Sequence, residues 1–378
     1  MLKPLAPFVF PDFTQELVPP LPADAPAFRP RSGTGQARRV WARLIGFAYT
    51  GRDDGPRPAG ENRLPRDAAG HLDLNEGTGG IVAMCSCDGF LEVYKQDVTY
   101  RIQTPETIDP DRTNPRAAFV AAVVDNVGSS NPVVARVLLQ GLEILNGAVF
   151  DRRISNEAVV RELHAIKEAL VACHKVAERV ASHVTRVVSD GEKHGLQGDE
   201  RGSFNPFPQV PDLDADATNF LIHSKRAIRR ISQLPSIFFS IPGDSDFDHL
   251  LKRLSKVASA GEMIDFVRDN APGIRCLSEL RNYQEHPKKG RQTIIDNFKV
   301  LPNGSVALPM WYVSGETPRP IAGEMRQAIE FLIMMAEAML IHLVMACVTK
   351  KFPFIIQPIE SVNPTNPMKY RSSVDIKV

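Results

Sequence analysis

The longest regular feature of the sequence is a helical pattern that runs from Ser155 to Gly191, about ten turns. Ser155 or Asn156 can cap its start, and Gly191 can end it. Its apolar residues recur every three or four positions and form one stripe: Val159, Leu163, Ile166, Leu170, Cys173, Val176, Val180, and Val184 or Val187. Other elements must cover such a stripe, so the sequence predicts a helical bundle around it.

Residues 155–350 are expected to form this mainly α-helical domain. Four shorter helical patterns follow the long one: TNFLIHSKRAIRRISQL, DFDHLLKRLSKV, AGEMIDFVRDN and GIRCLSELRNYQEH. Asp216 or Thr218 is expected to cap the first of these four. Residues 293–313 are expected to form a β-hairpin that turns at the Asn-Gly pair 303–304.

Residues 38–150 are predicted to form a strand-rich N-terminal domain, which makes the fold class α+β. Its β-branched and aromatic runs, separated by turn clusters, are VWARLIGFAYT, GGIVAMCSC, GFLEVYKQDVTYRIQ and AAFVAAVVDNV. Asn131 is expected to cap a helix that begins at Pro132. The proline-rich arm 1–37 is either an anchor for a protein partner or a disordered leader, and the tail 351–378 is expected to be extended.

The charge balance and the cysteines limit the class of protein. The chain has 45 basic and 44 acidic residues, so any attraction to nucleic acid must come from a local patch. Five cysteines, an odd number, fit free thiols in a reducing compartment. The first residues lack the apolar run and cleavage site of a signal peptide. We therefore expect a cytoplasmic protein.

One apolar run, FLIMMAEAMLIHLVMACV, extends from Phe331 to Val348 and is long enough to cross a membrane. Glu337 and His342 lie near its middle, where each would be costly in lipid. An apolar helix with a few polar residues is common in bundle cores. We therefore expect a buried helix of the last part of the bundle, and no membrane partner.

Several well-known catalytic and binding patterns do not occur in the sequence. It has no Walker loop, no G-x-S-x-G and no H-E-x-x-H. The Cys85-x-Cys87 pair has no second cysteine pair with which to hold zinc. We therefore expect neither a cofactor nor a bound metal.

The segment LSELRNYQEHPKKG holds the best candidate for chemistry. Arg281, Asn282 and His286 form an R-N-x-x-x-H pattern at the end of a predicted helix. The segment from about Asp216 to Pro287 resembles the HEPN family (higher eukaryotes and prokaryotes nucleotide-binding), whose small helical bundles carry an Arg-polar-x(2–4)-x-His signature on a late helix. Many members of that family are metal-independent endoribonucleases that work as dimers, whereas others are inactive scaffolds.

The resemblance implies an RNA-cleaving site and, by family analogy, a defence or toxin effector. Histidine suits proton transfer near neutral pH, and a guanidinium can hold a phosphate, so His286 would be the acid/base and Arg281 the phosphate ligand. Asn282 would orient the ring of His286. RNA phosphates would also bind a basic patch formed by Lys288, Lys289 and Arg291, together with Arg226, Arg229 and Arg230 of the earlier helix.

The spacing of Arg281 and His286 restricts the geometry of this site. Positions 281 and 286 lie about 140° apart around a helix, so they do not point the same way. Either a second copy of the chain completes the site, as a homodimer or higher homo-oligomer would, or His286 leaves the helix before Pro287. The alternative function is an inactive interaction and dimerisation module, in which Arg281 pairs with Glu279 or Glu285 and His286 caps the helix.

Overall fold

The computed structural model describes residues 74–87, 89–114, 116–151, 154–194, 207–243, 246–302 and 305–374. The proline-rich arm 1–37, the predicted strand at 40–50 and the hairpin turn at 303–304 lie outside the described residues. The helices, in chain order, are α1 (Pro105–Ile108), the π-helix η1 (Val133–Leu139), α2 (Gln140–Gly147), α3 (Asn156–His194), α4 (Leu213–Phe239), α5 (Phe247–Leu254), α6 (Gly261–Glu285) and α7 (Ile321–Cys347).

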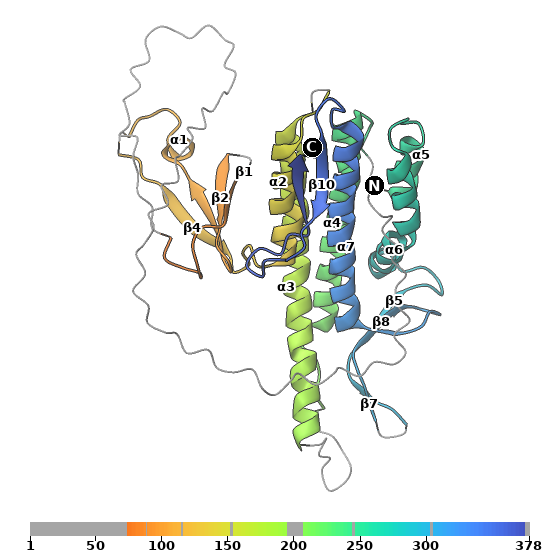
Figure 1. Cartoon of the computed structure of the whole chain (residues 1–378). Coiled ribbons are helices and arrows are strands. Elements are labelled where there is room, and N and C mark those ends of the chain that lie inside the picture. The colour runs from red at the N-terminus through yellow and green to blue at the C-terminus, as the bar shows by residue number, and fades with distance from the viewer. Residues whose placement is uncertain are drawn as a thin grey trace.

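An antiparallel sheet of four strands, with the short helix α1 between its last two strands, precedes the helical bundle and lies beside α3 (Figure 1). Its strands, in spatial order, are β1 (Ala83–Cys87), β2 (Phe90–Tyr94), β3 (Thr99–Gln103) and β4 (Val120–Asp125). Tyr94 on one face joins the main core, while Val93 and Tyr100 on the other face belong to a small second core. With the helices that follow, this sheet gives an α+β fold, as the sequence predicts.

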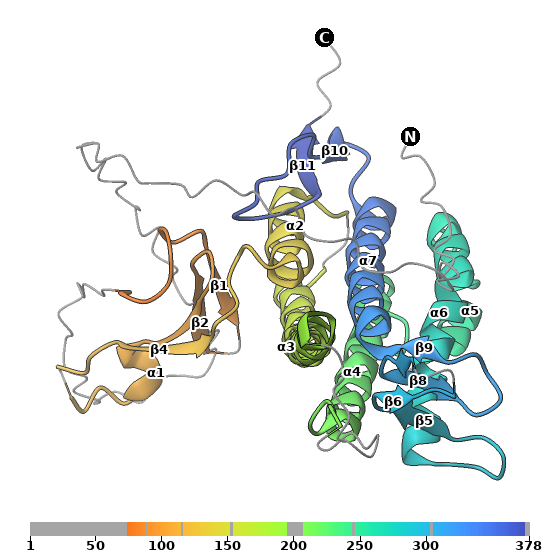
Figure 2. The same ribbon diagram turned by 90° about the horizontal axis from the view of Figure 1, so that it is seen from below.

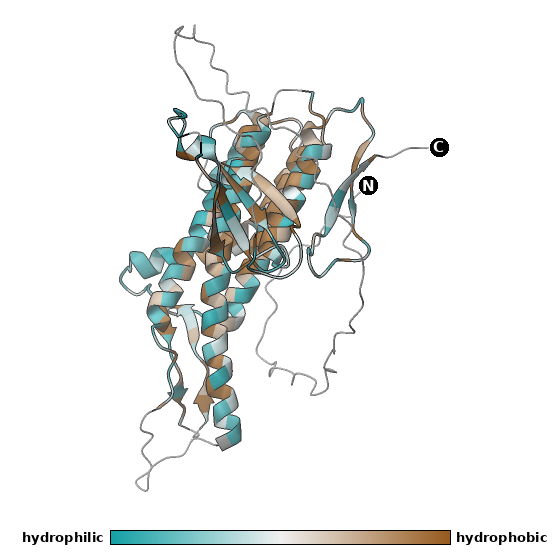
Figure 3. Ribbon diagram, turned by 90° about the vertical axis from the view of Figure 1, so that its left-hand side faces the viewer, coloured by the Kyte–Doolittle hydropathy of each residue, from teal (hydrophilic) through white to brown (hydrophobic). Residues whose placement is uncertain are grey.

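The helical part is a bundle in which α3 packs against α4 and α7 (Figure 2). The apolar stripe of α3 is buried along most of its length, and Val180 is its last fully buried valine. Beyond that point, the C-terminal turns of α3 project past the other helices and are largely hydrophilic (Figures 1 and 3). The change from stripe to polar surface therefore marks the edge of the bundle.

The predicted hairpin forms between α6 and α7. Strand β5 (Thr293–Asp296) pairs with β8 (Met310–Val313), and β6 (Lys299–Val300) pairs with β7 (Val306–Ala307), all antiparallel. A short strand, β9 (Arg319–Pro320), adds to β8 at the start of α7. Trp311 is fully buried against Phe220 of α4, which fixes this hairpin to the bundle.

Two predicted helix boundaries are wrong. Helix α4 begins at Leu213, so Asp216 and Thr218 lie within it and cap nothing; buried Leu213 packs its first turn against the core. The two helices predicted on either side of Pro272 are one helix, α6. Proline removes one helical N–H, but Ala271 beside it is buried in the bundle, and this packing outweighs the loss.

The helix after Asn131 also differs from expectation. Asn131 caps it as predicted, because its Oδ1 accepts the N–H of Val133 (2.9 Å). Its first turns, however, form the π-helix η1, every residue of which is buried, before α2 continues with ordinary geometry. π-helical turns are rare and are wider than α-helical ones.

The π-helix holds a buried ion pair with α7. Arg136 Nη2 donates to Glu337 Oε2 (2.6 Å), and each side chain is only 4% exposed. Gln140 Nε2 donates to the other carboxylate oxygen of Glu337 (2.7 Å), and Arg136 Nη1 reaches Glu330 at the surface (3.0 Å). The charge of Glu337 in the apolar run thus has a partner about 200 residues earlier in the chain.

Helix α7 is the one helix among the described residues that is long and apolar enough to cross a membrane, and 78% of its apolar stretch is buried inside the protein. Buried Glu337 and half-buried His342 face protein groups, with His342 stacked near Phe266 of α6. These features are those of a core helix in a soluble protein, as the sequence predicts.

The described part of the tail forms a hairpin of two extended strands. Strand β10 (Phe354–Pro358) pairs with β11 (Tyr370–Val374) in an antiparallel arrangement. The hairpin lies on α2, where Gln140 Oε1 accepts the backbone N–H groups of Lys369 (2.7 Å) and Tyr370 (2.8 Å). Sequence periodicity gave no sign of this partner, because the acceptors lie more than 200 residues away.

A charged cluster joins the N-terminal sheet to α3. The carboxylate of Glu92 is fully buried and accepts hydrogen bonds from Tyr94 Oη (2.5 Å), Arg101 Nη2 (2.8 Å) and Lys167 Nζ (2.9 Å). His164 Nε2 lies 3.0 Å from the same carboxylate. Burial alone raises the pKa of Glu92, but the nearby imidazole of His164 and the charge of Lys167 lower it well below its ordinary value.

This cluster predicts a stability change in acid. Because the folded-state pKa of Glu92 is depressed, its contribution is complete above the ordinary pKa of 4.5 and is lost as the pH falls below it. The free energy of unfolding of Glu92→Gln, measured in urea at several pH values, should therefore fall less steeply below that point than that of the wild type. The slopes should differ by up to about 1.4 kcal/mol per pH unit. Equal slopes would show that Glu92 does not carry this dependence.

Candidate active site

The candidate site lies at the C-terminal end of α6, beside the β5–β8 hairpin. Leu277 and Leu280 are buried and hold the last turns of α6 on the bundle, and Thr293 Oγ1 donates to the carbonyl of Leu280 (2.7 Å). The helix ends at Glu285, and Pro287 follows two residues later. His286 has left helical geometry (φ −132°, ψ 67°), although its N–H still donates to the carbonyl of Asn282 (2.8 Å).

Arg281 lies along the last turn and is held within its own helix. Its Nη2 forms an ion pair with Glu285 Oε2, and both side chains are 28% exposed. Its Nη1 donates to Asn282 Oδ1 (3.2 Å). Its Nε is buried and has no hydrogen-bond partner among the described residues. The guanidinium therefore keeps at least one N–H, that of Nε, without an acceptor in the described part of the chain.

His286 is three-quarters exposed, and its Nε2 lies 3.9 Å from Glu285 Oε2, the same oxygen that Arg281 contacts. The guanidinium and the imidazole of a single chain therefore meet at one carboxylate. The offset of about 140° does not separate them, because His286 is the first residue outside the helix.

Asn282 does not have the position that the spacing predicted. Its amide oxygen faces Arg281, and no hydrogen bond joins its side chain to the ring of His286 among the described residues. Once His286 leaves the helix, positions 282 and 286 no longer share a helical face. Glu285, which the sequence offered only as a structural partner of Arg281, is instead the residue that contacts both predicted catalytic groups.

The basic residues after His286 form a tight loop. Lys288 and Arg291 exchange two backbone hydrogen bonds (2.9 Å each), and Gly290 supplies the positive φ (+78°) that the turn needs. Both cations lie over the ring of Tyr283, at 6.0 Å and 5.0 Å from its centroid. Lys289 is exposed at the tip. This loop therefore carries three positive charges just after His286 in the chain, of which that of Arg291 is paired with Glu316 (3.0 Å).

The basic stripe on α4 is divided between two directions. Arg226 and Arg229 are exposed, whereas Arg230 forms an ion pair with Glu162 of α3 (3.2 Å) and is directed away from α6. Lys225 instead faces α6, and its Nζ lies 3.4 Å from Ser278 Oγ. The structure therefore groups Lys225 of this basic stripe with the α6 site, whereas Arg230 pairs with α3.

Burial lowers the pKa of Lys225; the carboxylate of Asp246 opposes this change, and the nearby charge of Arg281 adds to it. Lys225 and Arg281 are thus two cations on neighbouring helices, close enough to influence each other. An anion between them would be attracted by both charges.

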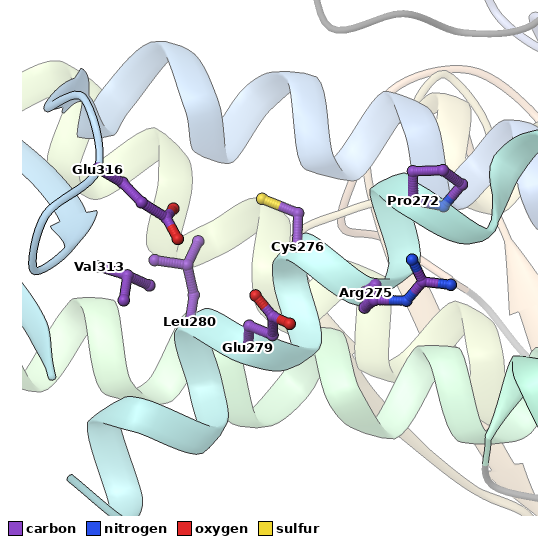
Figure 4. Close-up of a pocket in the computed structure, with 7 residues that line it drawn as sticks. All are labelled: Pro272, Arg275, Cys276, Glu279, Leu280, Val313 and Glu316. Carbon is purple, nitrogen blue, oxygen red and sulfur yellow. The ribbon is translucent and has the colours of Figure 1, made fainter. Parts of the chain in front are cut away.

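A shallow hollow of about 190 Å³ adjoins the site on the side of β8 (Figure 4). It is lined by Arg275, Cys276 and Glu279 from α6 and by Glu316 from the loop after β8, and Leu280 forms part of its wall. Neither Arg281 nor His286 lines it. Comparisons with known protein families, with curated proteins and with solved structures found no match to the chain.

Proposed function

We propose that the chain is a metal-independent endoribonuclease of HEPN type, with Arg281 as phosphate ligand and His286 as general acid/base. The observation that supports this most strongly is the meeting of both side chains at one oxygen of Glu285, on an accessible surface. A carboxylate and a phosphate both present negatively charged oxygens to a guanidinium. The scissile phosphate of RNA would therefore take the place of the Glu285 carboxylate.

The reaction needs no group beyond the RNA and these side chains. The 2′-oxygen attacks the adjacent phosphorus, its proton passes to an imidazole, and the bond from phosphorus to the 5′-oxygen breaks. The 5′-oxygen takes up a proton from a second, protonated imidazole, which leaves a 2′,3′-cyclic phosphate and a free 5′-hydroxyl. Arg281 stabilises the negative charge that develops on the phosphorus oxygens. In a homodimer, the second copy's His286 would supply the other proton transfer.

The surrounding charges support RNA as the substrate class. Lys288, Lys289 and Arg291 would bind phosphates on one side of the site, and Arg226 and Arg229 on α4 would extend this path. Tyr283 lies under two of these cations, where a base could stack once RNA displaces them. We propose a cytoplasmic protein, with a defence or toxin role.

The proposed activity is tested with the purified full-length chain and a single-stranded RNA in EDTA. The expected products end in a 2′,3′-cyclic phosphate, and a 2′-deoxy substitution at the cleaved position should prevent cleavage there. Products with a 3′-hydroxyl, or cleavage that stops in EDTA and returns with Mg²⁺, would contradict the proposal. Absence of cleavage across a panel of RNA sequences and structures would do the same.

Glu285 gives this site a specific prediction. Replacement of Glu285 by Gln keeps the shape of the side chain but removes the charge that competes with phosphate for Arg281. We expect faster cleavage at low RNA concentration, by up to about fivefold, because an exposed ion pair is worth at most about 1 kcal/mol. Initial rates measured below the KM would show the change.

Glu279→Gln is the matched control, because Glu279 lies on the same helix but lines the hollow rather than the site. It should leave the rate unchanged. If Glu285→Gln slows cleavage instead, Glu285 takes part in the reaction and does not merely compete with the phosphate.

One observation favours a second candidate function, an inactive module for helical interaction and dimerisation. Arg281 is already paired within its own helix by Glu285 and Asn282, as a structural arginine would be. In that case Arg281→Ala would change the thermal stability or the oligomeric state, and RNA would be neither bound nor cut. Size-exclusion chromatography of the variant, beside the cleavage assay, separates the two functions.

A further inference from the structure

Lys225 of α4 is a half-buried cation that no carboxylate in the described part of the chain pairs with. Its Nζ lies 3.4 Å from a neutral group, Ser278 Oγ of α6. Burial without an opposite charge disfavours the ammonium, and the pKa of Lys225 is lowered accordingly. Groups that carry this kind of cost are concentrated at binding and catalytic sites.

The packing of α4 on α6 places Lys225 beside Arg281. Ser278 and Arg281 are three residues apart on α6 and therefore share one side of that helix. On α4, Thr218 lies beside Gln284 of α6 (3.3 Å). Further along α4, Lys225 lies beside Ser278, so the two helices run antiparallel. Lys225 thus lies about one helical turn from Arg281, on the side away from the end of α6.

The charges around Lys225 favour one anion at this place. The positive charge of Arg281 acts against that of Lys225, so the two cations are near enough to share a negatively charged group. Asp246 favours the charged form of Lys225. Its Oδ1, however, accepts the N–H of Asp248 (2.8 Å) as the N-cap of α5. An anion from outside the chain would supply the direct partner that Asp246 does not.

We propose that Lys225 binds the phosphate next to the scissile one, so that the site holds two successive phosphates of one RNA strand. This inference rests on the proposed function, in which Arg281 binds the scissile phosphate. Ser278 keeps the ammonium beside α6, within one turn of that arginine. The substrate is therefore an oligonucleotide, because a dinucleotide has only the scissile phosphate and leaves Lys225 without a partner.

The test uses the full-length chain and DNA oligonucleotides that contain a single ribonucleotide, so that only one bond can be cleaved. A neutral methylphosphonate replaces the phosphate on the 5′ side or on the 3′ side of that bond. In the wild type, one of the two replacements should lower kcat/KM by about tenfold, as expected for a lost hydrogen bond between charged groups. Lys225→Gln should show this loss with the unmodified oligonucleotide and no further loss with the methylphosphonate. Two losses that multiply would overturn the proposal.

Three further measurements separate binding from folding. Lys225→Arg keeps the positive charge and should keep the sensitivity to the methylphosphonate. Lys369→Gln removes an exposed lysine beside β11 and should behave like the wild type. The free energy of unfolding of Lys225→Gln should be no lower than that of the wild type, because the variant removes a half-buried charge without a partner. A clear decrease would assign Lys225 a structural role and overturn the proposal.

Binding without cleavage separates this inference from the proposed function. With a fully 2′-deoxy oligonucleotide, the slope of log K against log salt concentration should be shallower in Lys225→Gln by about 0.7, the contribution of one single-strand phosphate. This difference without any cleavage of the ribonucleotide would contradict the proposed function and keep the Lys225 contact. Cleavage with equal slopes would overturn the inference alone, and absence of binding would overturn both.

Discussion

His286→Ala is expected to lower the rate of RNA cleavage in EDTA by about 10²–10⁴-fold, which is the usual contribution of a positioned general acid or base. The ring of His286 is three-quarters exposed and lies 3.9 Å from Glu285 in the ion-pair geometry. Its removal should therefore change the free energy of unfolding by less than about 0.5 kcal/mol. Single-turnover cleavage of a labelled RNA, together with urea unfolding, measures both quantities.

Arg281→Ala should lower the rate of RNA cleavage by a similar factor, about 10²–10³-fold, because it removes the group that stabilises the developing charge. Arg281→Lys should recover part of the rate, since an ammonium keeps the charge but not the fork of donors. His249→Ala, at an exposed histidine on α5, is the control and should cleave at the wild-type rate. Folded His286→Ala and Arg281→Ala variants that cleave normally would remove both residues from the mechanism.

Glu337→Ala is expected to lower the free energy of unfolding by about 3–5 kcal/mol, the cost of leaving a buried charge without its partner. Arg136 and Glu337 are each 4% exposed, so water cannot replace the lost carboxylate. Gln140 would lose its acceptor as well. Urea denaturation, read by the change in midpoint at constant slope, measures this loss.

Glu330→Ala is the matched control, because Glu330 contacts the same arginine but is 56% exposed. This variant should lower the free energy of unfolding by less than about 1 kcal/mol. Replacing both buried partners, as in Arg136→Met with Glu337→Leu, should restore most of the stability, since apolar pairs can replace buried ion pairs. If Glu337→Ala is no more harmful than Glu330→Ala, the buried pair does not stabilise the fold.

The parts of the fold that could be predicted are those governed by local pattern. The stripe along α3 and the hairpin over residues 293–313 follow from patterns that lie within a short stretch of the chain. Pro272 misled the prediction because local propensity favours a break there, whereas the packing of α6 on distant helices favours continuity. The π-helix η1 and the pairing of β10 with β11 also depend on partners far along the chain.

The residues of the candidate site could be proposed from the sequence, but the way in which their side chains meet could not. Spacing identified Arg281 and His286 and left open how they meet, because the exit of His286 from the helix depends on a few backbone angles. The place of Asn282 was wrong for the same reason. Glu92 gave no local sign of burial, and the apolar run around Glu337 gave no sign of its partner, since the partners lie 75 and 201 residues away. Whether a charged residue is buried depends on its partners in the tertiary structure, and a single sequence does not reveal those partners.

The contact between the β10–β11 hairpin and α2 has a consequence for the order in which the protein can fold during translation. Gln140 and Glu143 accept backbone N–H groups from residues 369–372, so α2 has unpaired acceptors until those residues exist. A ribosome makes the chain from its N-terminus, and α2 emerges long before β11. The hydrogen bonds that fix this hairpin on α2 can therefore form only after residue 372 has been translated.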